Sequence, residues 1–404
     1  MLISKMINKF FIALFIAATL GLNSLWAVRA ESRYFTPYFN MGMSQGAFLP
    51  SQGSFFAGAN LGMSVGLLTK ISENHSLFAL YNLGFSGEGF RFPDTAEFSS
   101  KDLSHNFNGE YRWQVLPWLR LRPGAGYMMN FTRTAAGEVW GEGLYDTKVT
   151  SGQLAADTSF EVFGKDTVFM VQGAYRVTDF PNYTDIIRVF KGLNSQSERL
   201  KDQAGLEGTL ALTWHKFFSS FRYGISAYKN EKVVESNGTY GNRAQEDTKI
   251  TLNGGFRGKL WIFETAPSVT YGINRSNQNY LLFKTATDIA PTFQPNYYDY
   301  NELGFDAPLY LNFTKKWALS GGLAYKRRDY TQRPPRDGSN AFTSGTQSNN
   351  MVTLTAGFRK KINEISSMTL TYTSVLATSN NRFEKYLPYN YSGQGISIGY
   401  QLTY

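Results

Sequence analysis

The segment "WLRLRPGAGYMMNF", Trp118 to Phe131, alternates between two kinds of side chain along most of its length. One set of alternate positions is apolar and comprises Leu119, Leu121, Ala125, Tyr127, Met129 and Phe131. The set between them is polar or small and comprises Arg120, Arg122, Gly124, Gly126 and Asn130. Because successive side chains of a strand point to opposite faces, this segment predicts a long strand with one apolar and one polar face.

The same alternation recurs along most of the chain. Further apolar rows begin at Ala57, Leu77, Leu206, Ile250, Leu303 and Val352, with Gly, Ser, Thr, Asn and charged residues between their members. The expected strands are about 10 to 14 residues long, whereas strands of soluble sheets usually have about 5 to 6. After residue 30 no long apolar run follows, so no transmembrane helix is expected.

The connections between these rows alternate in length. Short polar turns are expected at 72–74, 116–117, 164–166, 314–316 and 363–367. Longer stretches rich in Gly, Asn and Pro are expected at 86–101, 132–148, 179–201, 231–246, 277–298, 331–349 and 379–390. Tight periplasmic turns and longer outer loops are typical of membrane barrels.

The sequence therefore predicts an all-β fold, a transmembrane antiparallel up-and-down β-barrel over residues 31–404. We expect about 16 strands, with 14 or 18 as alternatives, and an even number places both termini on the periplasmic side. The expected ranges are 33–43, 55–68, 77–87, 102–115, 118–131, 149–163, 167–178, 203–216, 218–230, 247–262, 266–276, 300–313, 317–330, 350–362, 367–378 and 392–404. The rival is a secreted soluble β-sandwich or propeller, which strand length and loop rhythm disfavour.

Residues 1–30 have the composition of a secretory signal peptide. Lys5 and Lys9 precede an apolar run from Phe10 to Leu22, and Val28-Arg29-Ala30 provides small residues for cleavage. The alternative is a membrane anchor, but the run is shorter than the roughly 20 residues of a spanning helix. The chain has no cysteine, which excludes disulfides, thiolate metal sites and an N-terminal lipid-anchored cysteine.

The last strand carries a second indication of compartment. In "GISIGYQLTY", Gly395 to Tyr404, apolar and aromatic residues occupy every second position. The segment resembles the C-terminal recognition signal of bacterial outer-membrane proteins, which usually ends in Phe where this chain has Tyr404. Tyr400, Leu402 and Tyr404 are then the candidate assembly signal. The resemblance implies insertion into the outer-membrane lipid of a Gram-negative (diderm) bacterium by its outer-membrane assembly machinery.

Two further segments, "YKRRDYTQR" (325–333) and "SNNRFEKYLPYNYSGQGISIGYQLTY" (379–404), are similar to barrel domains associated with polysaccharide export or surface-protein assembly. This resemblance covers a small part of the chain. It implies an exported polymer or a surface protein among the possible partners and identifies no site residue.

Motifs for chemistry are sparse. "GISIG" (395–399) fits the G-x-S-x-G pattern, but no helix, acid or histidine follows it. The three histidines, His75, His105 and His215, have no metal-ligand spacing. We expect no enzymatic activity, no catalytic, metal-binding or cofactor-binding residues, no cofactor and no nucleic-acid partner.

If the apolar rows face lipid, the charged residues between them face the lumen. The expected inward bases are Arg112, Arg120, Arg122, Arg176, Arg222, Lys249, Arg257, Lys259, Lys326, Arg328, Arg359 and Lys361, and the expected inward acids are Glu88, Glu110, Asp157, Glu161, Glu207, Glu302 and Asp306. Arg112, Arg120, Arg122, Arg222, Arg257, Lys259 and Arg359 are the candidate pore-lining residues. These charges either form ion pairs that stiffen the wall or give a positive lumen that concentrates anions.

A barrel of this size is wide enough for an aqueous channel unless loops fill it. Residues 184–193 predict a short loop helix, and 132–148 could constrict the lumen or lie on the surface. The function expected first is a porin-like channel for passive passage of small solutes, anions among them, or of an exported polymer. The alternative is a non-conducting receptor, adhesin or assembly barrel for surface proteins. The substrate, the openness of the lumen and the oligomeric state, monomer or trimer, stay open.

Overall fold

The computed structural model describes residues 35–51, 56–88, 101–134, 138–184, 199–283, 291–384 and 389–404. All regular elements in these ranges are strands. None of the described segments is a helix long and apolar enough to cross a membrane. The expected signal peptide, 1–30, and residues 185–193 of the expected loop helix lie outside the described ranges.

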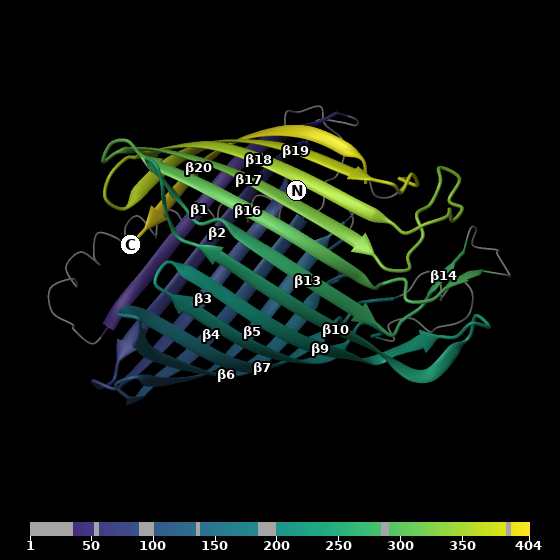
Figure 1. Ribbon diagram of the computed structural model, residues 1–404, viewed down its shortest axis with the longest axis horizontal. Helices are drawn as coiled ribbons and strands as arrows, with labels where there is room; N and C mark the ends of the chain where they lie inside the picture. The colour runs from purple at the N-terminus through teal and green to yellow at the C-terminus, as the bar shows by residue number, and fades with distance from the viewer. Residues whose placement is uncertain are drawn as a thin grey trace.

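The barrel wall consists of sixteen antiparallel strands, two of which are interrupted. The uninterrupted strands are β1 (Phe35–Pro50), β2 (Phe56–Lys70), β3 (His75–Glu88), β4 (Lys101–Leu116), β5 (Leu119–Arg133), β6 (Thr147–Val162), β7 (Lys165–Asp179), β8 (Gln203–Trp214), β9 (Phe217–Val234), β16 (Tyr300–Asn312), β17 (Trp317–Tyr330), β18 (Ser348–Lys361), β19 (Ser366–Ser379) and β20 (Tyr391–Thr403). The interrupted ones are β10 (Tyr240–Phe256) with β11 (Gly258–Leu260), and β12 (Phe263–Thr265) with β13 (Ser268–Ser276). A separate hairpin of β14 (Tyr280–Leu282) and β15 (Thr292–Gln294) lies beyond the outer rim (Figure 1).

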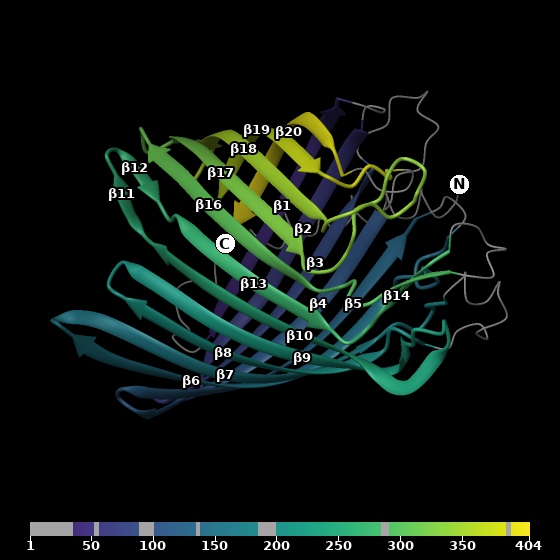
Figure 2. The same ribbon diagram turned by 45° about the vertical axis from the view of Figure 1, so that its right-hand side comes forward.

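The sheet closes on itself between β1 and β20. Their register runs from Asn40 opposite Thr403 to Pro50 opposite Gly393. The N–H of Tyr404 donates to the carbonyl of Phe39 at 2.8 Å, and the Phe39 N–H donates back to Tyr404 at 3.0 Å. Figure 2 shows β19, β20, β1 and β2 side by side in the wall. Closure leaves no free edge, so the backbone groups of the wall are paired without water.

The predicted strand number and fold class are confirmed, and a soluble sandwich is excluded. Several expected boundaries were wrong. β1 continues to Pro50 rather than ending at 43, and the expected loop 231–246 is mostly strand, with β9 ending at Val234 and β10 beginning at Tyr240. The tenth expected strand is broken at Arg257, whose N–H instead donates to Lys216. The eleventh, expected at 266–276, is paired only from Ser268, and the short strand β12 precedes it; Ala266 and Pro267 between them belong to neither strand, because proline has no N–H for the ladder.

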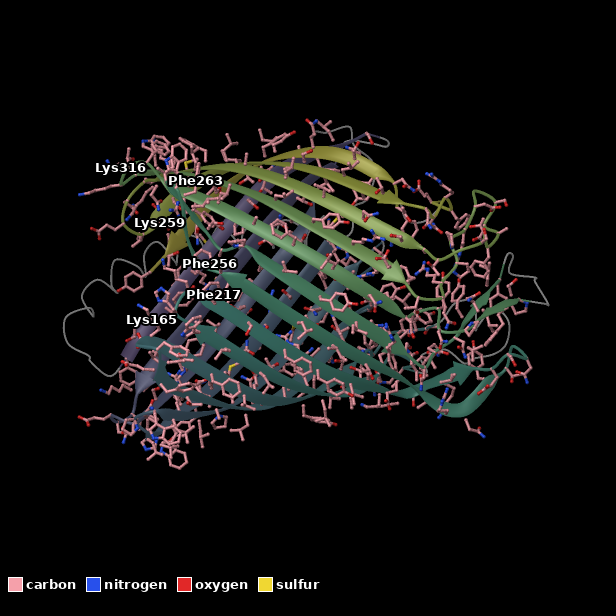
Figure 3. All side chains as sticks on the ribbon, in the orientation of Figure 1. Lys165, Phe217, Phe256, Lys259, Phe263 and Lys316 are labelled. Atoms are coloured by element: carbon pink, nitrogen blue, oxygen red, sulfur yellow. The ribbon has the colours of Figure 1, made fainter. Side chains whose placement is uncertain are left out.

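The outward face is an apolar belt. Exposed side chains on it include Val65, Leu67, Leu154, Leu206, Leu210, Leu252, Leu303, Leu354, Leu370, Ile396 and Ile398. Near the short turns this belt carries aromatic rings, including Trp118, Trp214, Phe217 and Trp261. Figure 3 shows Phe217, Phe256 and Phe263 at that end, together with Lys165, Lys259 and Lys316. An apolar band edged by aromatic residues is what a barrel presents to lipid and to the membrane interface.

The short turns are built for tight reversal. Between β6 and β7 only Phe163 and Gly164 form the turn, and both have positive φ, 52° and 66°. Positive φ at both central positions is the type I′ geometry, whose twist matches that of the flanking strands. The ring of Phe163 is 91% exposed and extends the aromatic end of the belt.

Candidate functional site

Most charged residues of the wall lie on the inner face of the barrel. The pairing register of the strands shows which residues share that face. Opposite residues of neighbouring strands share a face, and Gln114, Arg120, Asp157 and Met170 form one such row across β4 to β7. Side chains of this row converge: Arg122, two positions along β5, reaches Met170 two strands away at 3.3 Å. Convergence over that distance is expected on the concave side of a curved wall.

The largest group of inner charges is a five-residue network on β4, β5 and β6. Arg122 donates from Nε and Nη2 to the two oxygens of Asp157 at 2.6 and 2.8 Å, and from Nη1 to Glu110 at 2.9 Å. Arg120 donates to Asp157 from Nη2 at 2.9 Å, and Arg112 donates to Glu110 from Nε at 2.6 Å. Three guanidinium groups therefore share two carboxylates.

The two acids of this network and the central Arg122 are largely covered, whereas Arg112 and Arg120 are partly exposed. The side chains of Asp157 and Glu110 are 8% and 12% exposed, and that of Arg122 is 20% exposed. Replacing a whole buried ion pair by apolar residues often leaves stability unchanged. Removing one partner is destabilising, because the other charge is left unpaired in a low-dielectric environment. These five side chains therefore fix the relative positions of three strands.

Two smaller groups lie elsewhere on the wall, one on β16 and β17 and one on β8 and β9. Glu302 of β16 accepts hydrogen bonds from Arg328 at 2.6 Å and makes an ion pair with Lys326 at 3.0 Å, both on β17. Arg222 of β9 lies 3.4 Å from Glu207 of β8. In contrast to Asp157, these groups face open space, since Arg222 is 58% and Lys326 46% exposed.

Four inner cations near the short turns make no ion pair with any residue that the structure describes. They are Arg257 and Lys259 around the start of β11, and Arg359 and Lys361 at the end of β18. Arg257 lies over the ring of Phe218, 5.1 Å from its centroid. Arg176 and Lys249, farther along the barrel, are likewise without an ion pair within the described ranges.

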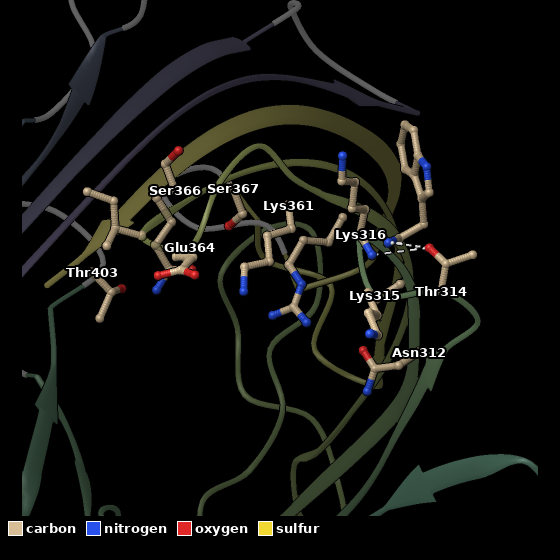
Figure 4. Close-up of a pocket in the computed structure, with 14 residues that line it drawn as sticks. Asn312, Thr314, Lys315, Lys316, Lys361, Glu364, Ser366, Ser367 and Thr403 are labelled. Atoms are coloured by element: carbon tan, nitrogen blue, oxygen red, sulfur yellow. Dashed lines mark hydrogen bonds between the residues drawn. The ribbon is translucent and has the colours of Figure 1, made fainter.

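Arg359 and Lys361 belong to a cavity of about 280 Å³ at the same end (Figure 4). Its wall also contains Lys315 and Lys316 of the neighbouring turn, and Glu364 is its one acidic residue. The Lys361 N–H donates to the Lys316 carbonyl at 2.7 Å, which holds the two turns together. The lining of this cavity at the short-turn end therefore carries four basic residues and one acidic residue.

The candidate pore-lining residues thus separate into two groups on the inner face. Arg112, Arg120, Arg122 and Arg222 are held in ion pairs, whereas Arg257, Lys259 and Arg359 are not paired with any described residue. The sequence reasoning missed several inner acids, among them Glu264, opposite Lys259, Asp247, opposite Ser226, and Asp166, opposite Glu161. Counting alternate positions back from Thr270 and Lys249 would have found the first two.

The candidate assembly signal lies on the outer row of β20. Tyr400 is opposite Met43, and Leu402 is opposite Met41, in the same alternation as the lipid-facing Ile396 and Ile398. Tyr404 continues that row next to Phe39. Its role in assembly stays a prediction, because the geometry describes the finished barrel.

Two of the three histidines, His75 and His105, lie on the outer face, and His215 lies in the turn between β8 and β9. The Tyr111 hydroxyl lies 2.6 Å from Nδ1 of His75, and the Tyr81 hydroxyl lies 2.8 Å from Nδ1 of His105. Among the described residues, no three His, Cys, Asp or Glu side chains gather as metal ligands. The segment Gly395–Gly399 is plain strand, with Ser397 opposite Gly46 and Thr371.

At the long-loop end of the barrel, side-chain amide groups join neighbouring loops by hydrogen bonds. Asn182 donates to the carbonyls of Gly141 and Gly143 at 2.9 and 3.1 Å, so the described part of 132–148 packs on the loop after β7. Gln278 accepts from the Val234 N–H and donates to the Lys232 carbonyl, both at 2.9 Å. Each of these two pairs of neighbouring loops is therefore joined by hydrogen bonds.

No protein-family model matches the chain, and no curated protein sequence matches it. Solved structures with a similar arrangement share little sequence. A loop-deletion variant of OmpT, an outer membrane protein of Vibrio cholerae, is 12% identical, with 92% of this chain and 100% of that chain covered and a TM-score of 0.47. CdiB from Acinetobacter baumannii is 10% identical, with 91% and 60% covered and a TM-score of 0.49. A bacterial polysaccharide outer membrane secretin is 10% identical, with 91% and 97% covered and a TM-score of 0.43.

Identity at this level assigns no role to any residue. What the chain's own geometry gives is a closed sixteen-strand wall, an apolar outer belt with an aromatic edge and a charged inner face. Only closed barrels and helices satisfy the backbone within lipid, and barrels of this form belong to bacterial outer membranes. The chain is an outer-membrane β-barrel protein.

Proposed function

We propose that this barrel is a passive channel for small hydrophilic solutes, with a preference for anions. The observation that supports this most is the solvent exposure of charged side chains on the inner wall. Arg222, Lys326 and Arg120 are 58%, 46% and 44% exposed although they point inward. Charged groups keep such exposure in a water-filled lumen, whereas a protein-filled lumen would cover them.

The preference for anions is supported by which inner charges form ion pairs and which do not. The inner acids Glu110, Asp157, Glu207 and Glu302 are each paired with an arginine or lysine. The cavity at the short-turn end carries Lys315, Lys316, Arg359 and Lys361 against Glu364. A confined aqueous path with low-dielectric walls focuses the field of such groups. Anions are then concentrated near the periplasmic end, and cations are depleted there.

The proposal is tested by single-channel recording in planar lipid bilayers with the full mature chain refolded in detergent. Discrete, ohmic current steps that are lost after heat denaturation of the same sample are the expected result. A correctly folded, heat-modifiable barrel that inserts into the bilayer and passes no current would contradict the proposal. That outcome would favour the alternative of a non-conducting receptor, adhesin or assembly barrel.

A further inference from the structure

A second cavity, of about 510 Å³, lies at the outer end of the barrel, where the strands give way to the long loops. Its wall combines the inner-face residues Tyr228, Asp247, Asn274, Tyr300 and Arg328 with loop residues that include Tyr183, Lys201, Tyr280, Tyr298 and Arg333. Small-molecule sites have volumes of roughly 300 to 1,000 Å³ and combine aromatic side chains with a few polar groups. We call this cavity the outer-mouth pocket.

Two aromatic walls of the pocket stand nearly at right angles. The rings of Tyr280 and Tyr298 are inclined at 80°, with centroids 6.4 Å apart. Tyr297 supports both: it stacks on Tyr280 at 4.2 Å and meets Tyr298 edge-on at 5.4 Å. Tyr297 is buried at 3% exposure, whereas Tyr298 is 39% exposed. Tyr298 is therefore the exposed member of this tyrosine cluster, and Tyr297 is its buried support.

Two of the basic groups around these rings are paired with acids. Lys201 lies 4.0 Å from Glu231, and Arg328 is paired with Glu302. Asp247 accepts hydrogen bonds from the hydroxyl of Tyr228 at 3.0 Å and from the amide of Gln245 at 3.2 Å. Because a carboxylate offers about four acceptor sites, Asp247 can still accept from a ligand. The pocket thus presents hydrogen-bonding groups without a large net charge.

The pocket is held in shape by contacts that need no ligand. The guanidinium of Arg333 lies between Tyr297 and Tyr330, 4.4 and 4.6 Å from their centroids. Asn279 donates from its side-chain amide to the Val234 carbonyl at 2.7 Å, which fixes the loop that carries Tyr280 to the β9–β10 hairpin. A preformed wall loses little conformational entropy when a ligand binds.

We propose that the outer-mouth pocket binds a neutral oligosaccharide. A sugar ring has apolar C–H faces, which fit the open ring of Tyr298 and its perpendicular neighbour Tyr280, and hydroxyl edges, which fit Asp247, Asn274 and the tyrosine hydroxyls. The balanced charges favour hydroxyl groups over carboxylate or sulfate groups. This inference goes beyond conduction, because binding is an equilibrium property of the folded barrel and is measured without any current.

The test is isothermal titration of the full, detergent-folded chain with maltotriose, cellotriose and N,N′-diacetylchitobiose, and with trigalacturonate as the charged comparison. Tyr298→Ala removes the open aromatic face, and Tyr298→Phe keeps it. Tyr38→Ala is the matched control, because Tyr38 is 40% exposed on β1 at the opposite end of the barrel and lies outside the pocket. Heat-modifiability on gels confirms that each variant is folded.

At least one of the three neutral sugars should bind the parent chain more tightly than trigalacturonate does. Tyr298→Ala should weaken that binding at least about tenfold, while Tyr298→Phe and Tyr38→Ala should stay within about twofold of the parent. Absence of binding by all three neutral sugars would overturn the inference. So would equal loss in the Tyr38 variant, or tighter binding of trigalacturonate. Binding without conductance would leave this inference standing and contradict only the proposed channel.

Discussion

At the scale of single residues, Asp157 is the side chain on which the inner wall depends most. Its two oxygens accept four hydrogen bonds, two from Arg120 and two from Arg122, across the β5–β6 pair. The side chain of Asp157 is 8% exposed. Among the described residues, Arg120 forms an ion pair with Asp157 alone, whereas Arg122 also forms one with Glu110.

Asp157→Asn should therefore destabilise the barrel. Loss of the charge leaves Arg120 and Arg122 facing each other with one carboxylate fewer, and we expect a cost of about 1 to 3 kcal/mol, because Arg120 is partly solvated. Denaturant-induced unfolding in detergent measures the change. Asp306→Asn is the control, since Asp306 is an inward acid without an ion pair among the described residues. Equal stability of both variants would show that the network contributes nothing.

Glu384 gives a prediction with a pH dependence. Its Oε1 accepts hydrogen bonds from the backbone N–H groups of Tyr389 and Asn390 and from the Asn390 side chain, at 3.1, 2.7 and 2.7 Å. Burial raises the pKa of this carboxyl, but the three hydrogen bonds outweigh it and leave the pKa below its ordinary value. Its stabilising contribution is then complete above the ordinary glutamate pKa and is lost as the pH falls through the lowered value.

We therefore expect Glu384→Ala to lower the melting temperature at pH 7, by an amount that corresponds to about 1 kcal/mol. The difference between variant and parent should narrow when both are measured at a pH below the carboxyl pKa, since the parent has then lost the charge. Scanning calorimetry at the two pH values measures it. A difference that is the same at both values, or larger at the acidic one, is incompatible with this assignment.

At the scale of strands and loops, the alternating connection lengths determine orientation. The turn 235–239 after β9 and the segment 331–347 after β17 belong to the long-loop end, and the turns at 72–74 and 314–316 belong to the short-turn end. Epitope tags inserted at 235–239 or at 337–340 should bind antibody on intact cells. Tags at 72–74 or 314–316 should bind only after permeabilisation. The opposite labelling pattern would mean that the barrel is inserted the other way round.

The strand β20 gives a second prediction at this scale. Tyr404 is joined to Phe39 by two backbone hydrogen bonds and continues the outer row of Tyr400 and Leu402. Tyr404→Asp places a charge on that row, next to lipid, and removes the aromatic residue that resembles the assembly signal. The yield of heat-modifiable protein in the outer membrane should fall severalfold. Gln401→Asp, an inward-facing change on the same strand three residues before Tyr404, is the control and should assemble normally.

Much of the fold could be predicted because the alternation itself decides the face of each residue. Arg120 and Arg122 were placed inward from their neighbours alone, and the structure has them there. Their partner could not be predicted: Asp157 lies 37 residues from Arg120, and the pairing depends on the register of β5 and β6, which a local pattern leaves open.

The boundaries that were wrong have local causes. Pro267 interrupts a strand because proline has no backbone N–H to donate. This interruption could have been predicted, since the proline is visible in the sequence. The extension of β9 to Val234 and β10 from Tyr240 crosses polar residues, so composition favoured a loop there. The outer-mouth pocket was missed for another reason. Its tyrosines come from several loops and strands, and only the closed barrel brings them together.

At the scale of the whole molecule, the positive charge of the lumen is divided between paired and unpaired cations. Replacing Arg257, Lys259, Arg359 and Lys361 together with Gln should move the selectivity toward neutral or cation preference and leave unfolding nearly unchanged. Replacing Arg120 and Arg122 with Gln should mainly reduce stability, because their charges are compensated by Asp157 and Glu110. Bilayer recording and unfolding of both variants separate the two roles, and equal effects of the two variants on selectivity would refute the division.

The most direct test of a positively charged, water-filled lumen is the zero-current potential of the unmodified barrel across a KCl gradient. Near about 0.1 M salt, where screening extends over about 10 Å, the potential should have the sign of chloride preference. It should decrease toward zero near about 1 M, where the screening length is about 3 Å. A potential of the opposite sign at low salt, or a folded and inserted barrel that carries no current, would contradict the account.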